Sequence, residues 1–318
     1  MKKLPHKIKP ILSVIILNYN AKDYLKKLID SIDCSQLKPF FIEVIIADNA
    51  STDSSFALAK TGSQKNPQIK YIFHSNTDNI GFAAGNNQGL TVSNPNSQYV
   101  LFLNPDTTVA KNTLCQMIEF FEENSPVDAA TCDLILALNG RTQPESHRGF
   151  PTPWNAFCHF FGFGLPKLFP YSKLLNGYFL GHLDYSKTQK IDACVGAFFM
   201  LKRSVGDSIG WWNDQYFFYG EDLDFCWRLK QLGFSLYFFP EAKAIHYQGI
   251  SSGGIAQKQK HSSASRATKI KVAQASTTAM RIFYRLNLIN HYPIYLRWLV
   301  WLGIDLLEFY RVLKAKYL

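Results

Sequence analysis

The first 135 residues alternate between short apolar runs and segments of helical periodicity, and no other feature restricts the fold as strongly. Apolar, often β-branched residues fill four runs, at 12–17, 44–47, 71–73 and 99–103. Helix-like segments lie between or after these runs, at 22–33, 51–59, 82–92 and 111–123. Apolar strands that alternate with helices are typical of a parallel sheet covered on both faces. We therefore predict an α/β fold with a Rossmann-like, mostly parallel central sheet and flanking helices.

The alternation stops after this half of the chain. Residues 139–187 are rich in Gly, Pro and aromatic residues, which predicts an insertion or a flexible loop. Regular structure is expected again at 191–201, as a helix over 220–231, and as a strand over 235–239. We predict one α/β domain over 1–250, with halves at 1–135 and 136–250.

A basic tail follows this domain. Residues 255–318 hold eleven Lys or Arg against two acids, while residues 1–254 hold 23 basic and 22 acidic residues. Such a tail favours an anionic partner, either lipid or nucleic acid, although a solubilising tail is the alternative. No motif that reads nucleic acid is present, so we expect no nucleic-acid partner.

The tail over 251–318 is expected to contain a linker and an amphipathic helix. Its Ser-, Gln- and Lys-rich part, 251–275, is expected to be mobile, and a final helix is expected from Pro293 onwards. That helix interleaves Trp, Tyr and Leu with charges, which favours a helix lying on an anionic membrane surface over a membrane span. Packing on the chain's own core, or on a second subunit in a homodimer, is the alternative.

The cysteines and the N-terminus indicate a cytoplasmic setting. The six cysteines have neither the spacing of a zinc site nor that of a secreted disulfide framework. The first residues are basic, but the apolar run after them is short and lacks a cleavage signal. We predict no signal peptide and no spanning helix.

Polar clusters end three of the apolar runs. They are Asn18-Tyr19-Asn20, Asp48-Asn49 and Asn104-Pro105-Asp106. Each alone is explained by an ordinary turn, but ligands of α/β sheets bind beyond the carboxyl ends of the strands. Asp48 suits the N–H donor of a pyrimidine base, and Asp106 suits a divalent cation held against a diphosphate.

Two further segments carry candidate site residues. The segment 79–89 places three glycines at a helix start, where backbone can approach an anion closely, although the pattern is not a P-loop. The segment 217–229 opens a helix with Glu221, Asp222 and Asp224. Asp222 and Asp224 point in different directions on a helix, so one is expected at a reaction centre and the other in a structural role. His246 follows the last strand and is a candidate second metal ligand beside Asp106.

Together these segments resemble a known family. The matching stretches are SVIILNYNAKDYLKKLIDSI, IIADNASTDSS, NIGFAAGNNQGL, YVLFLNPDTTV, IDACVGAFFMLKRS, FFYGEDLDFCWRLKQLGFSLYFFPEAKAIHYQGISS and RIFYRLN. In this order, over 12–287, they are similar to the family-2 inverting glycosyltransferases of the GT-A fold. The likeness is strongest to the rhamnosyltransferase-type branch, which builds bacterial cell-surface polysaccharides.

The resemblance implies a role for each matched position. The donor site would contain Asn18, Asn20, Asp48, Gly81, Asn86, Asn104 and Asp106. Asp106 and His246 would bind the metal, Asp222 would be the catalytic base, and Gly196 and Glu221 would lie on the acceptor side. Asn104 stands where the family's DXD metal motif has its first Asp, which leaves Asp106 as the main carboxylate ligand.

The resemblance also implies a reaction. Asp222 would take a proton from an acceptor hydroxyl as it attacks the sugar of a dTDP- or UDP-sugar, with inversion and with Mg²⁺ or Mn²⁺ bound. The acceptor would be a glycan or a polyprenyl-diphosphate-linked sugar at the inner face of the cell membrane. The alternative is an inactive sugar-nucleotide- or glycan-binding protein of the same fold, for which Asn104 is the main support.

Overall fold

Four parallel strands form the N-terminal half of the sheet in the computed structural model, which describes residues 11–63, 65–124, 126–162, 164–247 and 266–317. These strands are β1 (Leu12–Asn18), β2 (Ile42–Asp48), β3 (Ile69–Ser75) and β4 (Tyr99–Leu103). They lie in the order β3-β2-β1-β4, with β1 pairing in parallel with both β2 and β4. This half confirms the predicted alternation, and its carboxyl ends meet at one edge.

The C-terminal half of the sheet is mixed. Its strands are β5 (Thr107–Val109), β6 (Ala129–Leu136), β7 (Gln189–Lys190), β8 (Phe198–Lys202) and β9 (Leu236–His246). Strand β8 runs antiparallel to β4 and β6, whereas β6 and β9 are parallel. Short β5 pairs antiparallel with the end of β9. The α/β class is therefore confirmed, with the parallel part of the sheet limited mainly to its first four strands.

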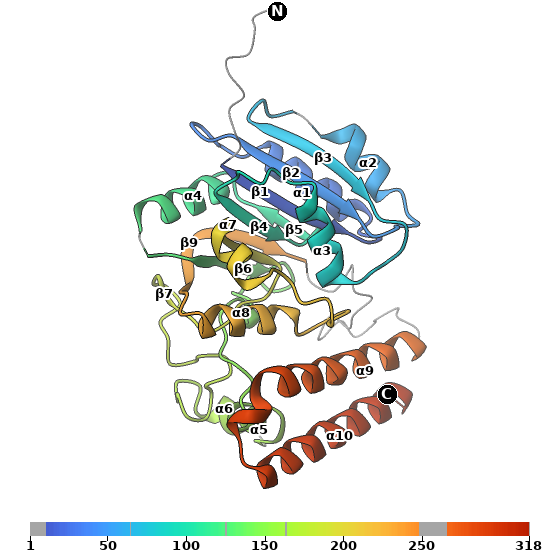
Figure 1. The fold of residues 1–318 in the computed structure, drawn as a ribbon, viewed down its shortest axis with the longest axis vertical. Coiled ribbons are helices and arrows are strands. Elements are labelled where there is room, and N and C mark those ends of the chain that lie inside the picture. Colours follow the sequence, from blue (N-terminus) through green and yellow to red (C-terminus); the bar gives the residue numbers. More distant parts are fainter. Residues whose placement is uncertain (1–10, 64, 125, 163, 248–265, 318) are drawn as a thin grey trace, which may run out of the picture.

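Helices cover both faces of this sheet (Figure 1). One core packs α1 (Asp23–Asp33), α2 (Ser55–Gly62) and α4 (Thr113–Glu123) on the first face. The other packs α3 (Phe82–Thr91), α7 (Arg203–Ile209) and α8 (Glu221–Gln231) on the second. Strand β1 supplies both cores because successive side chains alternate: Val14 and Ile16 face the first and Ile15 the second.

The segment predicted as an insertion contains short helices as well as loops. They are the 3₁₀ turn η1 (Pro144–Ser146), α5 (Pro153–Phe161) and α6 (Leu165–Leu168). The side chain of Thr152 accepts a hydrogen bond from the Asn155 backbone N–H and so caps α5, whose first residue is a proline. Helices α5 and α6 lie at the end of the molecule opposite β3, next to the C-terminal helices (Figure 1).

The C-terminal tail is a helical hairpin. Helix α9 (Arg266–Phe283) leads through the π-helical turn η2 (Tyr284–Leu288) and the 3₁₀ turn η3 (Ile289–His291) to α10 (Ile294–Tyr317). The two long helices lie side by side (Figure 1), and Arg281 of α9 pairs with Asp305 and Glu308 of α10. None of the described helices is long and apolar enough to span a membrane.

The helix α9 corrects the expectation of a mobile segment over 251–275. Residues 266–275 are helical, while 251–265 lie outside the described residues. The Ala, Lys and Gln of this segment are good helix formers, and its apolar residues become buried only against other elements. Ala279, Phe283 and Tyr284 enter the core beside α8. The expected final helix is confirmed as α10, close to its predicted start.

Candidate active site

One large cavity, of about 1460 Å³, lies beyond the carboxyl ends of β1 and β4. It is lined by seven of the residues singled out in the sequence: Gly81, Asn104, Asp106, Gly196, Glu221, Asp222 and His246. They come from the loops after β4, before α3 and before β8, from the first turn of α8, and from the end of β9. The fold thus brings acids more than a hundred positions apart to one cavity, at the sheet edge where ligands are expected.

Asp106 and His246 face each other because β5 pairs with β9. Thr107 lies opposite His246 in the register, and the Tyr247 backbone N–H donates to the Asp106 carbonyl, at 2.8 Å. As a result His246 Nε2 lies 3.3 Å from Asp106 Oδ1, and both side chains are buried. The short strand β5 was not predicted, yet it decides this contact.

Gln143 fixes which nitrogen of His246 carries the proton. The amide Oε1 of Gln143 lies 2.7 Å from His246 Nδ1, so Nδ1–H donates to it. The lone pair of Nε2 then points at Asp106 Oδ1, which has no hydrogen-bond partner. A cation between or beside these two buried acceptors would satisfy both of them. Gln143 was not a sequence candidate, because only the tertiary contact reveals it.

This arrangement fits a divalent metal that is shared with a ligand. No group of three or more His, Cys, Asp or Glu that could hold a metal occurs within the described ranges. Mg²⁺ and similar ions, however, commonly bind through one or two carboxylates together with phosphate oxygens. Asp106 and His246 would supply the protein ligands, and Asn104 also lines the cavity beside them.

Asp222 is held in the cavity wall by two hydrogen bonds. Its Oδ2 accepts from Arg148 Nη2 at 2.6 Å, in an ion pair with little solvent exposure. Its Oδ1 accepts from the Leu223 backbone N–H at 2.7 Å. A carboxylate has about four acceptor positions, so Asp222 can still accept a proton from a bound hydroxyl. The contact between Arg148 and Asp222 comes from the fold, because the two residues lie 74 positions apart in the chain.

Glu221, the neighbour of Asp222, is in a different electrostatic state. Its Oε2 is buried without a hydrogen-bond partner. Burial, followed by the negative charge of Asp222, raises the pKa of Glu221 to about 8. Burial by itself would lower the pKa of the Arg148 guanidinium. The negative charge of Asp222 beside it raises that pKa, and the result lies above the usual value for arginine. The site therefore contains the Asp222–Arg148 ion pair beside Glu221, a carboxyl that holds its proton near neutral pH.

Four predicted donor-site residues do not line the cavity. Asn18 Nδ2 donates to Asp48 Oδ1 at 2.6 Å, and Asp48 Oδ2 accepts from the Ser51 backbone N–H. Asn20 Oδ1 accepts from the backbone N–H groups of Thr52 and Asp53, and Asn86 Nδ2 donates to the Phe82 carbonyl. In this structure these side chains hold the loops after β1 and β2 and the start of α3. Asn49, next to Asp48, does line the cavity.

The glycines of the 79–89 segment mainly permit close packing. A Cβ on Gly85 would lie 2.6 Å from the side chain of Leu17 on β1, and one on Gly89 would lie 2.9 Å from Ile15. Gly81 has a positive φ of 88°, and its Cβ would meet the Phe217 carbonyl oxygen at 2.6 Å. Only Gly81 lines the cavity, so approach to a ligand does not explain the other two.

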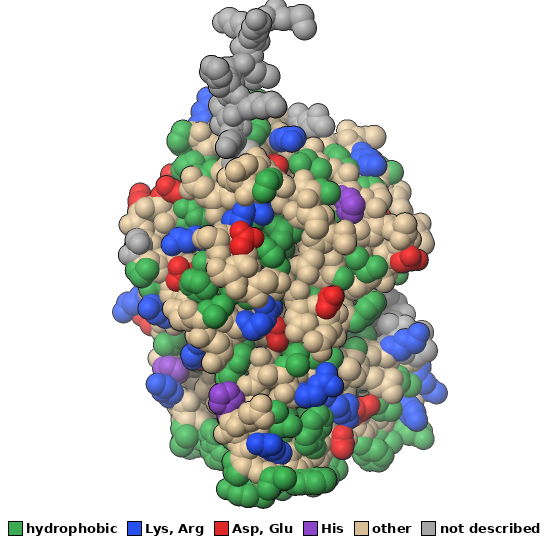
Figure 2. Space-filling model, viewed as in Figure 1, with side chains coloured by type: hydrophobic (Ala, Val, Ile, Leu, Met, Phe, Trp, Pro, Cys, Tyr) green, Lys and Arg blue, Asp and Glu red, His purple; other side chains and the backbone are tan. Residues whose placement is uncertain are grey.

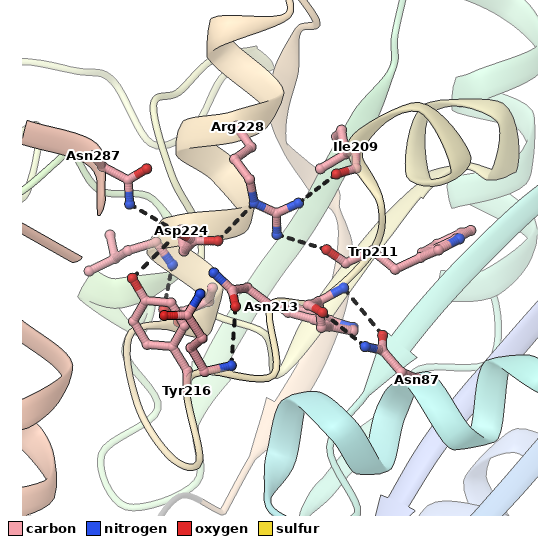
Figure 3. Close-up of polar contacts among 12 residues, drawn as sticks. Asn87, Ile209, Trp211, Asn213, Tyr216, Asp224, Arg228 and Asn287 are labelled. Atoms are coloured by element: carbon pink, nitrogen blue, oxygen red, sulfur yellow. Dashed lines mark hydrogen bonds and ion pairs between the residues drawn. The ribbon is translucent and has the colours of Figure 1, made fainter. Parts of the chain in front are cut away.

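Asp224 has the structural role that its spacing from Asp222 predicted (Figure 3). Its Oδ2 accepts from Arg228 Nε at 2.8 Å, and its Oδ1 from Asn287 Nδ2 at 2.9 Å. Arg228 also donates to the carbonyl oxygens of Ile209 and Trp211. This network joins α8 to the loop after α7 and to the turn η2, which connects the two long helices of the C-terminal hairpin. The RIFYRLN stretch thus provides Asn287 as a tie between the tail and the catalytic half.

The comparisons with known proteins identify the family of the chain. The model of Glycosyl transferase family 2 matches residues 13–210, which is more than half of the chain. The chain belongs to glycosyl transferase family 2. Its β1-to-α7 region, with Asp48, Asp106 and Gly196, lies inside the match, whereas Asp222 and His246 follow it.

Individual relatives cover most of the chain at low identity. Rhamnosyltransferase WbbL of Escherichia coli K12 is 27% identical over 240 residues, which is 74% of this chain and 82% of that protein. The N-acetylglucosaminyl-diphospho-decaprenol L-rhamnosyltransferase of Mycobacterium tuberculosis CDC 1551 is 22% identical, over 76% of this chain and 78% of its own length. Both matches support the rhamnosyltransferase-like branch.

A solved structure confirms the fold. The mannosyltransferase PcManGT of Pyrobaculum calidifontis, in complex with GDP-Man and Mn²⁺, superposes with a TM-score of 0.55 at 16% identity. The match covers 98% of this chain and 74% of that chain. This chain therefore has the mixed α/β architecture of the GT-A glycosyltransferases.

Proposed function

We propose that this glycosyltransferase is metal-dependent and inverting, and that it transfers a sugar from a nucleoside diphosphate to a hydroxyl of a glycan or lipid-linked acceptor. Cell-surface polysaccharide synthesis is the proposed setting. The observation that carries the proposal is that Asp106, His246 and Asp222 line a single cavity. An inverting transfer needs one base and one site for the leaving diphosphate, and these residues supply both.

Asp106 and His246 would position the donor through a shared metal ion. A metal held by Asp106 and His246 would offset the negative charge that develops on the departing diphosphate. The loops around Asp48 and Asn49 lie beside the same sheet edge and suit a base such as uracil or thymine. The structure of PcManGT with bound GDP-Man and Mn²⁺ supports the binding of a nucleotide-sugar together with a metal ion. The rhamnosyltransferase relatives favour dTDP-rhamnose as the donor.

Asp222 would act as the base. The acceptor hydroxyl approaches the anomeric carbon, the new C–O bond forms as the bond to the diphosphate breaks, and the hydroxyl proton moves to Asp222. Arg148 orients the carboxylate of Asp222 through the contact at 2.6 Å. Glu221 and Gly196 lie on the same wall and would contact the acceptor. One displacement inverts the anomeric centre without a covalent intermediate.

The tail offers a surface for a membrane. Large apolar side chains of α10 are exposed along one face, among them Trp298, at 72% exposure, and Phe309, at 68%. In Figure 2 hydrophobic side chains gather with Lys and Arg at the end of the molecule that holds the C-terminal hairpin. We propose a peripheral position on the anionic inner face of the cell membrane, where a polyprenyl-diphosphate-linked acceptor would be found. The alternative is that the same face of α10 packs against a second subunit in a homodimer.

The deciding experiment is release of nucleoside diphosphate from a panel of dTDP- and UDP-sugars, with Mg²⁺, Mn²⁺ or EDTA. We expect metal-dependent release, and NMR of the product should show an inverted anomeric centre. Asp222→Asn should lower turnover about 10²- to 10⁴-fold while donor binding persists.

A surface carboxylate provides the control. Asp192 forms an exposed ion pair with Lys230, so Asp192→Asn should keep wild-type turnover. Donor binding without release for any sugar would instead favour the inactive binding protein. Near-normal turnover of Asp222→Asn would remove Asp222 as the base.

A further inference from the structure

The cavity continues into an apolar groove, away from the Asp106–His246 pair and from the two acids at the start of α8. This groove lies between α5 on one side and α9 and α10 on the other. Its lining includes Phe157, Phe161, Met280, Leu296, Val300 and Leu307. The whole cavity, about 1460 Å³, is larger than the roughly 300–1,000 Å³ of a typical pocket for one small ligand. A second, largely apolar ligand can therefore occupy the groove beside the donor.

An arginine without an acidic partner lies in this groove. Arg311 of α10 lines the cavity, donates to Ser276 Oγ at 2.7 Å, and has its guanidinium 5.3 Å from the ring centre of Phe160. No ion pair of Arg311 is found in the described part of the chain. Burial lowers the pKa of its guanidinium, although Tyr178 and Tyr219 partly offset this. Arg281 on the same hairpin, by contrast, is paired with two acids.

We propose that the groove between α5, α9 and α10 binds the prenyl chain of a polyprenyl-diphosphate-linked acceptor, and that Arg311 binds its diphosphate. The proposal rests on the proposed transferase function and names the part of the acceptor that this site recognises. A prenyl diphosphate is apolar at one end and strongly anionic at the other. The groove combines an apolar wall with an unpaired cation, so both parts of the ligand find complementary chemistry.

The position of the groove agrees with this ligand. One end of the cavity holds Asp222, where the acceptor sugar must present its hydroxyl. The other end is bordered by exposed apolar side chains of α5 and α10, including Trp154, Leu299 and Leu302. A lipid chain leaving the groove would therefore pass directly to the face proposed to lie on the membrane. The relative from M. tuberculosis, whose name specifies a decaprenol-linked acceptor, supports this class of ligand.

The test is a binding measurement that needs no sugar transfer. Farnesyl diphosphate, inorganic diphosphate and farnesol are titrated into the full chain by calorimetry, with EDTA present so that the metal site does not bind the diphosphate. We expect farnesyl diphosphate to bind at least about tenfold more tightly than either fragment, because each fragment lacks one half of the recognition. Equal affinity for farnesyl diphosphate and inorganic diphosphate would overturn the proposal that the groove binds the prenyl chain.

Two variants separate the groove from the exposed apolar face. Arg311→Gln should weaken farnesyl diphosphate binding roughly ten- to hundredfold and leave farnesol binding unchanged. Arg285→Gln removes the same charge from an exposed position outside the cavity and should have no effect. Gly303→Leu should weaken both prenyl ligands, because Gly303 lines the groove and a Cβ there already lies 3.8 Å from Phe161. The exposed face is unchanged by that substitution, and a helical Gly→Leu change favours folding.

Release of nucleoside diphosphate is measured in parallel. We expect the Arg285→Gln control, whose site lies outside the cavity, to keep metal-dependent donor hydrolysis. Wild-type release without prenyl diphosphate binding would overturn the groove and leave the transferase standing. Prenyl diphosphate binding without release from any donor would instead contradict the proposed transferase. Wild-type affinity for farnesyl diphosphate in Arg311→Gln and Gly303→Leu would overturn the assignment to this groove.

Discussion

Replacing Gln143 tests whether His246 is a metal ligand. In the wild-type chain Gln143 Oε1 accepts from His246 Nδ1–H, at 2.7 Å, and so directs the Nε2 lone pair at Asp106. In Gln143→Leu that acceptor is lost. The imidazole proton can then move to Nε2, where it would donate to Asp106 Oδ1, only 3.3 Å away, and satisfy both groups without a metal.

The expected effect follows from the buried hydrogen bond. A buried donor left without an acceptor costs about 1–3 kcal/mol. At about 1.4 kcal/mol per tenfold, this corresponds to roughly a 5- to 150-fold loss of metal affinity. Residues that orient metal-binding histidines typically contribute about 10–100-fold, so the two estimates agree. We expect Gln143→Leu to need about that much more Mn²⁺ for half-maximal binding.

The assay is an Mn²⁺ titration followed by electron paramagnetic resonance, with UDP or dTDP present to complete the coordination. Gln143→Glu is the matched control, because its carboxylate also accepts from Nδ1–H and should keep or improve affinity. Thermal unfolding without metal checks that both variants fold. Unchanged Mn²⁺ affinity in a folded Gln143→Leu protein would refute the reasoning that His246 Nε2 is presented to a metal.

Three other predictions follow from the same structure. The pKa of the Glu221 carboxyl is raised from 4.5 to about 8 in the folded chain. The folded chain therefore binds the carboxyl proton more tightly than the unfolded chain does. The free energy of unfolding that this proton contributes is lost as the pH rises from about 4.5 through 8. Glu221→Gln should therefore flatten the metal-free Tm-against-pH curve in that window; an unchanged slope contradicts the buried carboxyl. Gly85→Ala should lower stability by about 1–3 kcal/mol in urea unfolding, because its Cβ would lie 2.6 Å from Leu17, and full stability would disprove that contact. The double change Trp298→Asp and Phe309→Asp should abolish flotation with anionic vesicles without changing the Tm. Flotation equal to that of the wild type would exclude the α10 face as the membrane-binding surface. Loss of a dimer, with flotation unchanged, would assign this face to contact with a second subunit.

The sequence alone determined the class of fold and pointed to seven residues that line the cavity. Apolar runs such as 44–47, separated by helical segments, determined the α/β alternation, because burial on both faces leaves a strand little choice of composition. Asp106 became a candidate because several polar clusters end the predicted strands, and Asp222 because three acids open one helix, while the roles of both were implied by the family resemblance. The separate roles of Asp222 and Asp224 followed from helix geometry.

The tertiary structure decided the contacts that give these residues their chemistry. The three-residue strand β5 is too short to predict, yet its pairing with β9 sets Asp106 against His246. The contacts of Gln143 and Arg148 join segments about 70 to 100 positions apart, and no local pattern encodes such a contact. Helix α9 looked like a polar linker because its few apolar residues gain their burial only from α8 and α10. The periodicity of a segment indicates which of its faces is buried. The protonation states of Glu221 and His246, and the groove between α5, α9 and α10, depend instead on contacts between segments that are distant in the sequence.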